Sequence, residues 1–238
     1  MTPDAPSGIL VVDKVPGMTS HDVVMLVRRK LGLKRVGHAG TLDPMASGVL
    51  LIVVGQATKR QQALQGHGKT YDATIRLGEQ TDTGDATGRV IARADVPALE
   101  PPRTRKVLAS CEGASIQTPP MFSAVKVQGR PLYWWARKGA PQPARPREIQ
   151  VDALELLACA AGELRVRVAC SAGTYVRTLA ETIAQRLGTA GHLSALSRLS
   201  VGPWTLAQAR DLCWVASASR EQLIGAMQPL EGFAHASV

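Results

Sequence analysis

A carboxylate and an imidazole lie five residues apart in a glycine-rich stretch, where Gly37–Leu50 reads GHAGTLDPMASGVL. These side chains belong to His38 and Asp43. Glycine lets the backbone pass close to another molecule, and Pro44 disfavours the α conformation for the aspartate before it. An Asp-Pro dipeptide alone would indicate only a turn before a strand. The whole stretch predicts a stiff loop, poor in side chains, that presents Asp43 and His38 for chemistry.

An arginine stands where a helix is predicted to begin. Residues 171–174 read as a turn, and apolar residues then recur at helical spacing up to Gly188. A cation in the first helical turn is unfavourable to the helix dipole, so Arg177 requires a reason. A nearby buried carboxylate would supply one. We expect Tyr175 and Arg177 to project from this first turn, off the buried face of the helix.

A second group of carboxylates lies in residues 81–88, TDTGDATG. The aspartate spacing is superficially that of a calcium loop, but the glutamate that closes an EF-hand is missing. The four cysteines lie far apart and form no C-x-x-C pair, which excludes a zinc ribbon. We therefore expect no metal site.

The composition indicates a folded protein with a polyanionic partner. Hydrophobic residues make up 45% and charged residues 20% of the 238 residues, and the formal net charge is +9. A basic excess of this size favours nucleic acid, although it is also compatible with a merely solvated basic surface. No segment has the pattern of a signal peptide or a membrane span, so we expect a cytoplasmic protein.

The elements that position these candidates can be predicted from periodicity. Buried strands are expected at Gly8–Asp13 and Val49–Val54, and a capped helix over residues 19–32. Apolar and polar residues alternate over Lys69–Gly78, which predicts a half-buried strand with Tyr71 near its start. Further strands are predicted at Glu148–Leu157, Glu163–Cys170 and Gly191–Val201, and a helical segment at 205–228.

Residues 97–150 differ from the rest in composition. They are rich in proline, arginine and lysine, and they contain the run Tyr133-Trp134-Trp135. Short helices are expected at Arg103–Cys111 and Pro131–Lys138, separated by an extended excursion over Ile116–Val127. We interpret the segment as an inserted subdomain outside the main sheet. Basic residues interleaved with aromatic ones suit single-stranded RNA, although the aromatic residues could equally form a small satellite core.

Five short motifs follow one another along residues 8–205: Asp13-Lys14-x-Pro-Gly-x-Thr-Ser, Gly37-His38-x-Gly-Thr-Leu-Asp43-Pro, Lys69-x-Tyr71, Pro119-Pro120-Met-x-Ser-Ala-Val-Lys126 and Gly173-Thr-Tyr175-x-Arg177-Thr. In these motifs the chain resembles the TruB family of tRNA pseudouridine-55 synthases. Five motifs in the family's order are far more specific than any one of them.

The resemblance implies an α+β fold, with a mixed, largely antiparallel central β-sheet flanked by helices and an inserted RNA-binding subdomain. The catalytic domain would cover residues 8–205, with the thumb-like insertion at about 100–147 and a short helical extension at 206–238. The implied activity is isomerisation of the T-loop uridine, position 55 of tRNA, to pseudouridine. It implies no cofactor and no metal. The expected partner is the tRNA T-arm stem-loop, bound by a monomer that requires no protein partner.

The resemblance also assigns roles residue by residue. Asp43 would be the catalytic carboxylate, and it would either attack C1′ or take a proton from C2′ of the ribose. Arg177 would be its counter-ion, since a carboxylate in an apolar pocket otherwise loses its charge. Tyr71 would stack on the detached base. The remaining matched roles are base-pocket walls at Tyr175 and Leu196, a prop in the space left by the flipped base at His38, and phosphate contacts at Lys14 and Lys126.

Family members of ordinary length carry a C-terminal RNA-binding PUA domain, and we expect none here because residues 206–238 are too few. We do not expect the guide-RNA-dependent role of related archaeal and eukaryotic synthases, which relies on that domain. Two other functions stay open from the residues alone. One is a glycosidase-like hydrolase that pairs Asp43 with Asp82 or Asp85. The other is a non-catalytic tRNA-binding or tRNA-folding module.

Overall fold

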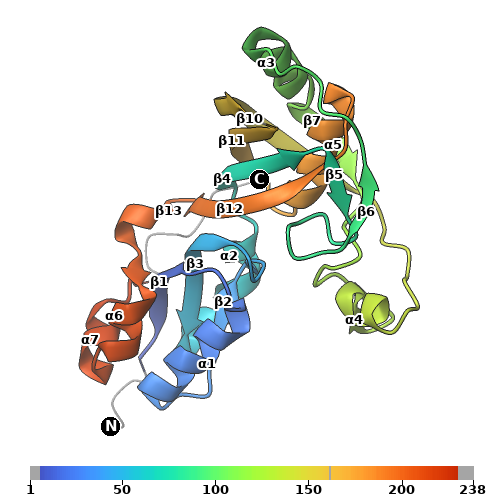
Figure 1. Ribbon diagram of the computed structural model, residues 1–238. Helices are drawn as coiled ribbons and strands as arrows, with labels where there is room; N and C mark the ends of the chain where they lie inside the picture. Colours follow the sequence, from blue (N-terminus) through green and yellow to red (C-terminus); the bar gives the residue numbers. More distant parts are fainter. Residues whose placement is uncertain (1–5, 161, 230–238) are drawn as a thin grey trace. The chain divides into compact units, whose positions relative to one another are not determined.

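The computed structural model describes residues 6–160 and 162–229, which form two compact units (Figure 1). Unit 1 combines the described residues up to His67 with those from Ser197 onwards, and unit 2 comprises Gly68–Leu196. One strand, β12 (Gly191–Val201), therefore begins in unit 2 and ends in unit 1. Both units combine helices with mostly antiparallel strands, so the fold is α+β, as predicted.

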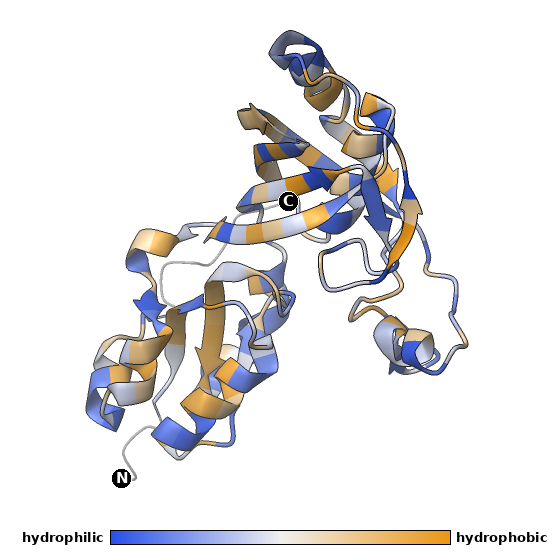
Figure 2. Ribbon diagram, viewed as in Figure 1, coloured by the Kyte–Doolittle hydropathy of each residue, from blue (hydrophilic) through white to orange (hydrophobic). Residues whose placement is uncertain are grey.

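Strand β3 (Ser47–Val54) is the centre of unit 1. It pairs antiparallel with β1 (Gly8–Lys14) and with β2 (Val36–Ala39), and its first residues pair in parallel with the end of β12. Apolar residues of β3 are fully buried, and Figure 2 shows the strand as a hydrophobic band. The shorter strands of the unit are β13 (Trp204–Thr205), which pairs with β12, and β14 (Arg210–Asp211), which pairs with β1.

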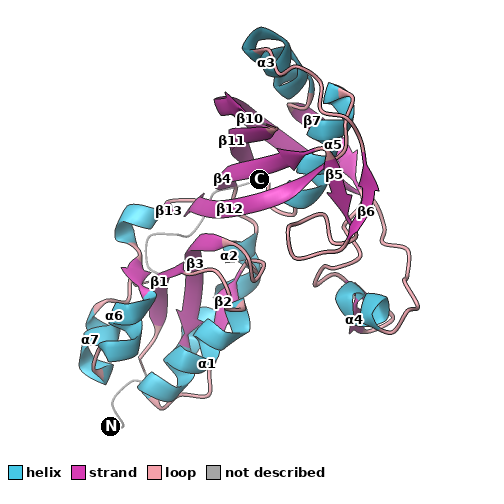
Figure 3. Ribbon diagram, viewed as in Figure 1, coloured by secondary structure: helices cyan, strands magenta, loops and turns pink. Residues whose placement is uncertain are grey.

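The helices of unit 1 cover these strands. Helix α1 (Ser20–Leu31) begins with a capping box between Thr19 and Asp22 and ends at Gly32, which has a left-handed φ of 65°. Both ends agree with the prediction of a helix over residues 19–32. The other helical elements are a 3₁₀ turn at Gly55–Arg60, α2 (Gln61–Gln65), a 3₁₀ turn at Leu206–Gln208, α6 (Leu212–Ser217) and α7 (Arg220–Gly225) (Figure 3).

The sheet of unit 2 has the strand order β12-β4-β11-β10-β7. Its strands are β4 (Lys69–Leu77), β7 (Gly113–Gln117), β10 (Arg147–Ala160) and β11 (Glu163–Cys170), joined by the first part of β12. Helix α5 (Val176–Leu187) packs against β4, and α3 (Pro101–Ser110) packs against β10 and α5. A separate two-stranded sheet consists of β5 (Glu79–Thr81) and β6 (Val90–Arg93).

Two predictions about the fold were wrong in part. Residues 36–39 form strand β2 rather than the start of a loop, because their main chain pairs with Leu51–Val54. Within the expected insertion, Gly113–Gln117 is an edge strand of the unit 2 sheet, since it pairs with β10. The boundaries of the predicted domains are untested, and the last residues of the predicted C-terminal extension, 230–238, lie outside the described residues.

Residues 126–137 of the expected insertion lie apart from that sheet (Figure 1), whereas α3 packs against β10. A small hairpin of β8 (Lys126–Val127) and β9 (Arg130–Pro131) leads into helix α4 (Leu132–Arg137). The two hairpin residues Gln128 and Gly129 have φ values of 51° and 76°, as a tight primed turn requires. The predicted turn and short helix are both confirmed.

Candidate active site

The loop that carries Asp43 joins β2 to β3 in unit 1, and residues 40–46 are called the Asp43 loop below. Asp43 is partly exposed, and its carbonyl accepts a hydrogen bond from the N–H of Ala46 at 3.0 Å. Ser20, at the start of α1, binds the main chain of Leu42: its Oγ accepts from the N–H at 2.9 Å and donates to the carbonyl at 3.1 Å. The aspartate therefore stands on a loop whose backbone is fixed on both sides.

Lys14 binds the main chain of the Asp43 loop from the protein interior. Its predicted role as a phosphate contact is therefore wrong. The side chain is 0% exposed, and Nζ donates to the carbonyls of Met18 at 2.8 Å, Val15 at 3.0 Å and Pro44 at 3.3 Å. An ammonium that is fully buried and occupied by three carbonyls cannot reach RNA. Burial lowers the pKa of Lys14 to about 8, while the negative charge of Asp43 acts to raise it.

Arg198, at the unit 1 end of β12, is a residue that the sequence reasoning missed. Its guanidinium is 1% exposed and donates to the carbonyls of Val49 at 2.7 Å, Gly40 at 3.0 Å and Thr41 at 3.3 Å. These carbonyls lie before and after Asp43 in the chain, so one planar cation ties together the two ends of the loop. The available signal was the alternation of β12, which places Arg198 on the same buried face as Leu196.

Gly48 makes this arrangement possible. Its φ is +102°, and a Cβ at this position would lie 2.2 Å from the carbonyl oxygen and 2.6 Å from the nitrogen of Arg198. No side chain can be accommodated against backbone at such distances. The glycine therefore allows β3 and β12 to pair at the position where Arg198 turns inward.

His38 lies on β2, directly opposite Ile52 of β3. Its Nδ1 atom is buried and has no hydrogen-bond partner among the residues that the structure describes. Burial lowers the pKa of His38, and the positive charges of Arg198 and His21 lower it further, so the imidazole is neutral near pH 7. A neutral ring with an unused nitrogen suits stacking or hydrogen bonding to a base.

In unit 2, Tyr71 lies on β4 opposite Val168 of β11 and is 6% exposed. The alternation predicted for this strand is confirmed, with Ala73 and Ile75 buried on the same face. Leu196, on the unit 2 part of β12, is 8% exposed. The residue predicted to stack on the base and one predicted wall of its pocket are thus nearly buried side chains of the unit 2 sheet.

Arg177 is buried, so the expectation that it projects off the buried face of α5 was wrong. It is 3% exposed. Its Nη1 donates to the carbonyl of Thr83 and its Nη2 to the carbonyl of Phe122, both at 2.8 Å, and its Nε lies 3.9 Å from Oδ2 of Asp85. The carboxylate that lies beside Arg177 within unit 2 belongs to Asp85, and the role of Arg177 as counter-ion of Asp43 stays a prediction.

Asp85 is fixed by its own loop. Its Oδ1 accepts from Oγ1 of Thr83 at 2.8 Å and from the N–H and Oγ1 of Thr87 at 2.9 and 2.5 Å. Asp82 accepts from the N–H of Arg89 at 2.9 Å and from its Nε at 3.2 Å. Both carboxylates of the acidic loop are therefore occupied in holding the loop and Arg177, which does not favour either of them as the second carboxylate of a hydrolase.

Tyr175 precedes α5 as its N-cap residue and is partly exposed. Gln117 of β7 binds its main chain on both sides: Oε1 accepts from the Tyr175 N–H at 2.7 Å, and Nε2 donates to its carbonyl at 3.1 Å. Edge strand β7, which was predicted as part of an insertion, therefore has a direct role in fixing a candidate site residue.

Lys126 is exposed on β8, as a phosphate contact requires. The neighbouring helix α4 carries two stacks of a cation on an aromatic ring. The guanidinium carbon of Arg130 lies 5.4 Å from the Trp134 ring centroid, and that of Arg137 lies 5.5 Å from the Tyr133 centroid. Cations and rings thus alternate on the surface of this hairpin and helix.

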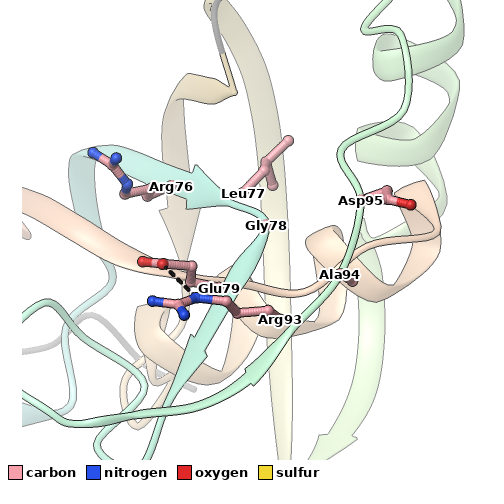
Figure 4. Close-up of a pocket in the computed structure, with 7 residues that line it drawn as sticks. All are labelled: Arg76, Leu77, Gly78, Glu79, Arg93, Ala94 and Asp95. Carbon is pink, nitrogen blue, oxygen red and sulfur yellow. Dashed lines mark hydrogen bonds and ion pairs between the residues drawn. The ribbon is translucent and has the colours of Figure 1, made fainter.

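A surface pocket of about 550 Å³ lies elsewhere in unit 2, lined by Arg76, Leu77, Gly78, Glu79, Arg93, Ala94 and Asp95 (Figure 4). Two of its charged side chains pair with each other, because Nε of Arg93 lies 3.0 Å from Oε1 of Glu79. None of the predicted site residues lines it. Among the described residues, no three His, Cys, Asp or Glu side chains are placed to hold a metal ion, and no helix is long and apolar enough to cross a membrane.

Comparison with known proteins supports the assignment suggested by the motifs. Residues 28–176 match the family model described as TruB family pseudouridylate synthase, N terminal domain. The chain belongs to the TruB family. It is 47% identical over 205 residues to tRNA pseudouridine synthase B of Opitutus terrae, an alignment that covers 86% of this chain and 85% of the relative. It is 43% identical to the protein of the same name from Aromatoleum aromaticum, with 94% of this chain and 72% of the relative covered.

Solved structures agree with membership of the TruB family. The protein solved as a Cbf5-Nop10-Gar1 complex is similar with a TM-score of 0.71 and 32% identity over 95% of this chain. The protein solved as an H/ACA RNP bound to a substrate RNA containing 2′-deoxyuridine is similar with a TM-score of 0.68 and 28% identity over 96% of this chain. The chain spans 61% and 65% of those two chains. The fold is that of pseudouridine synthases, and the activity is that of an isomerase.

Proposed function

We propose that this protein converts the T-loop uridine at position 55 of tRNA to pseudouridine, with Asp43 as the catalytic carboxylate. The observation that carries the proposal is the Asp43 loop, in which a carboxylate is presented on a backbone fixed by Ser20, Lys14 and Arg198. Relatives named tRNA pseudouridine synthase B support the same reaction and a tRNA substrate.

The reaction is an isomerisation that breaks the C1′–N1 bond and forms a C1′–C5 bond, with no change in oxidation state. A proton leaves C5 of the base and one is gained at N1, so no cofactor is consumed. The enzyme must supply a charged carboxylate against the ribose, and Asp43 would either attack C1′ or remove a proton from C2′. The cations Lys14 and Arg198 lie beneath the loop and favour the charged form of a carboxylate upon it.

The detached base must be held while it turns. In the proposal, Tyr71 stacks on the uracil, Tyr175 and Leu196 form walls, and His38 occupies the space from which the base is flipped. Arg177 keeps the reacting carboxylate charged and oriented. The burial of Arg177 beside the occupied carboxylate of Asp85 supports a fixed electrostatic role for this arginine.

The partner is the T-arm stem-loop of tRNA, bound by a monomer in the cytoplasm. The net charge of +9 and the exposed cations around Lys126 and α4 support an RNA-binding surface in the segment at about 100–147. Light scattering of the protein during gel filtration tests the monomeric state. An isolated T-arm hairpin should be modified as a whole tRNA is, and a hairpin from another tRNA arm should not.

Tritium release tests the chemistry. Unmodified tRNA labelled at uridine C5 should release tritium from one T-loop position with the wild-type protein and none with Asp43→Asn. The matched control is Asp82→Asn, which changes a carboxylate that pairs with Arg89 and should release tritium at the normal rate. Free uracil and an abasic ribose would indicate a hydrolase. Tritium release by Asp43→Asn at the wild-type rate would exclude Asp43 as the catalytic group.

A further inference from the structure

Two residues that pair across neighbouring strands, Gln117 and Arg147, both contact Tyr175 at the start of α5. Gln117 of β7 and Arg147 of β10 stand directly opposite each other in the antiparallel register. Gln117 is 7% exposed and binds both the N–H and the carbonyl of Tyr175. This bidentate contact fixes the tyrosine backbone, but it leaves the orientation of the side chain undetermined.

Arg147 acts on the ring of the same residue. The guanidinium carbon lies 4.8 Å from the Tyr175 ring centroid, nearer than in the other three arginine–aromatic stacks among the described residues. A Cβ added to Gly173 would also meet the guanidinium carbon and Nη1 at 3.4 Å. The guanidinium therefore lies close to both the backbone of Gly173 and the ring of Tyr175. Its Nε is buried without a hydrogen-bond partner among the described residues.

A buried guanidinium nitrogen without a partner costs free energy, so the position of Arg147 is not explained by hydrogen bonding. The stack on Tyr175 is the attractive contact that the geometry provides. Covering one face of a ring restricts the ring and leaves the other face for a second planar group. A uracil that leaves its RNA stack is such a group.

We propose that Arg147 is a positioning residue for the reaction: together with Gln117 it holds the Tyr175 ring so that a single face remains for the flipped uracil. This proposal rests on the proposed function and adds a residue that lies outside the five motifs. The cross-strand pair divides the task, since Gln117 fixes the backbone of the tyrosine and Arg147 fixes its ring.

A double-mutant cycle tests the proposal. Arg147→Ala should lower the single-turnover rate of tritium release at saturating RNA by about tenfold, the size expected of a desolvated cation–π contact. In a Tyr175→Leu background, which keeps both main-chain bonds to Gln117, Arg147→Ala should cause no further loss. Arg147→Lys should restore part of the rate, because a cation returns but the planar stack does not. RNA affinity should stay within about twofold of wild type in all three.

The matched control is Arg210→Ala, which removes a similar stack on Trp214, at 5.0 Å, in unit 1. It should leave the rate unchanged. A wild-type rate in Arg147→Ala would overturn the proposal, and so would equal losses in the wild-type and Tyr175→Leu backgrounds. A weaker affinity with a smaller salt dependence would overturn it too, since it would make Arg147 a phosphate contact. If Asp43→Asn is inactive in the same assay, these results reject the inference alone and leave the proposed function intact.

Discussion

Each unit contains buried cations next to candidate site residues. They differ in whether a carboxylate lies near the cation. Lys14 and Arg198 in unit 1 donate only to main-chain carbonyls, and no carboxylate among the described residues lies within ion-pair distance of either. Arg177 in unit 2 also donates to carbonyls, but it lies 3.9 Å from the carboxylate of Asp85.

This difference separates two ways in which a buried cation can stabilise a nearby anion. Carbonyl dipoles satisfy the N–H donors of a cation without cancelling its net charge, so Lys14 and Arg198 keep a positive field under the Asp43 loop. Arg177 lies beside the carboxylate of Asp85, which helps to fix the geometry of its guanidinium. We therefore expect the unit 1 cations to fix the position of Asp43 and support its charge, and Arg177 to orient the reacting groups in addition to its proposed counter-ion role.

The largest effect is expected from Arg177→Lys. A lysine cannot reproduce the fork that binds two carbonyls at 2.8 Å, so the rate at saturating RNA should fall on the order of a hundredfold. Filter binding should show little change in RNA affinity. Arg186→Lys, on the last turn of the same helix, is the control and should keep most of the rate. Near-normal turnover in Arg177→Lys would contradict an orienting role.

Arg198→Lys should have the next largest effect. The ammonium keeps the charge but cannot bridge the carbonyls of Gly40 and Val49, which lie at opposite ends of the loop. We expect the free energy of unfolding to fall by about 2 kcal/mol and the rate to fall about tenfold. Arg28→Lys is the comparison, because Arg28 binds a single carbonyl, that of Val36, and should lose less stability. Equal losses in the two variants would show that the bridge has no special role.

A smaller effect is expected in the pH dependence of stability, through Lys14. The pKa of Lys14 is lowered to about 8 from 10.5, so between these values the unfolded chain binds a proton at Lys14 that the folded protein has lost. Stability contributed through this group must therefore rise with pH across that window. Denaturant melts at intervals from pH 7 to 10 should show this rise in the wild type. In Lys14→Met this component should be missing, and identical slopes in both proteins would contradict the assignment.

The smallest effect is expected at an exposed ion pair of unit 2. Arg167 binds Asp72 through Nε at 2.8 Å and Nη2 at 3.0 Å across β11 and β4. Its side chain is 44% exposed, so solvent screens the pair. Arg167→Ala should lower the free energy of unfolding only slightly and leave tritium release unchanged. A loss as large as that of Arg198→Lys would remove the distinction between buried and exposed cations.

The elements that sequence reasoning placed well have signals confined to a few neighbouring residues. The cap at Thr19, the glycine end of α1 and the strict alternation around Tyr71 are local, and each appears in the structure as expected. Strand β2 was missed because Val36–Ala39 is short and glycine-containing, and only its pairing with β3 makes it a strand. Strand β7 was missed for the same reason, since its partner β10 begins thirty residues later.

The sequence predicted which residue types form the candidate site. It did not predict the hydrogen bonds that hold those residues in place. The family motifs pointed to Lys14 and Arg177, but Lys14 was predicted as a phosphate contact and the helical spacing placed Arg177 off the buried face. Their burial depends on carbonyls supplied by distant segments, such as Pro44 for Lys14 and Phe122 for Arg177. Arg198 was missed because it lies outside the five motifs, although the strand period of two places it on the same buried face as Leu196.

The close approach at Gly48 has a practical consequence for anyone who wishes to redesign the specificity of this enzyme. Random libraries that run from the Asp43 loop into the start of β3 will lose most of their members at the Gly48 codon, because even alanine would collide with the main chain of Arg198. Thr41 and Pro44 are exposed and tolerate variety in their side chains, although the carbonyl of each is already engaged. A productive library would therefore keep Gly48 constant and vary exposed loop positions such as Thr41 and Pro44.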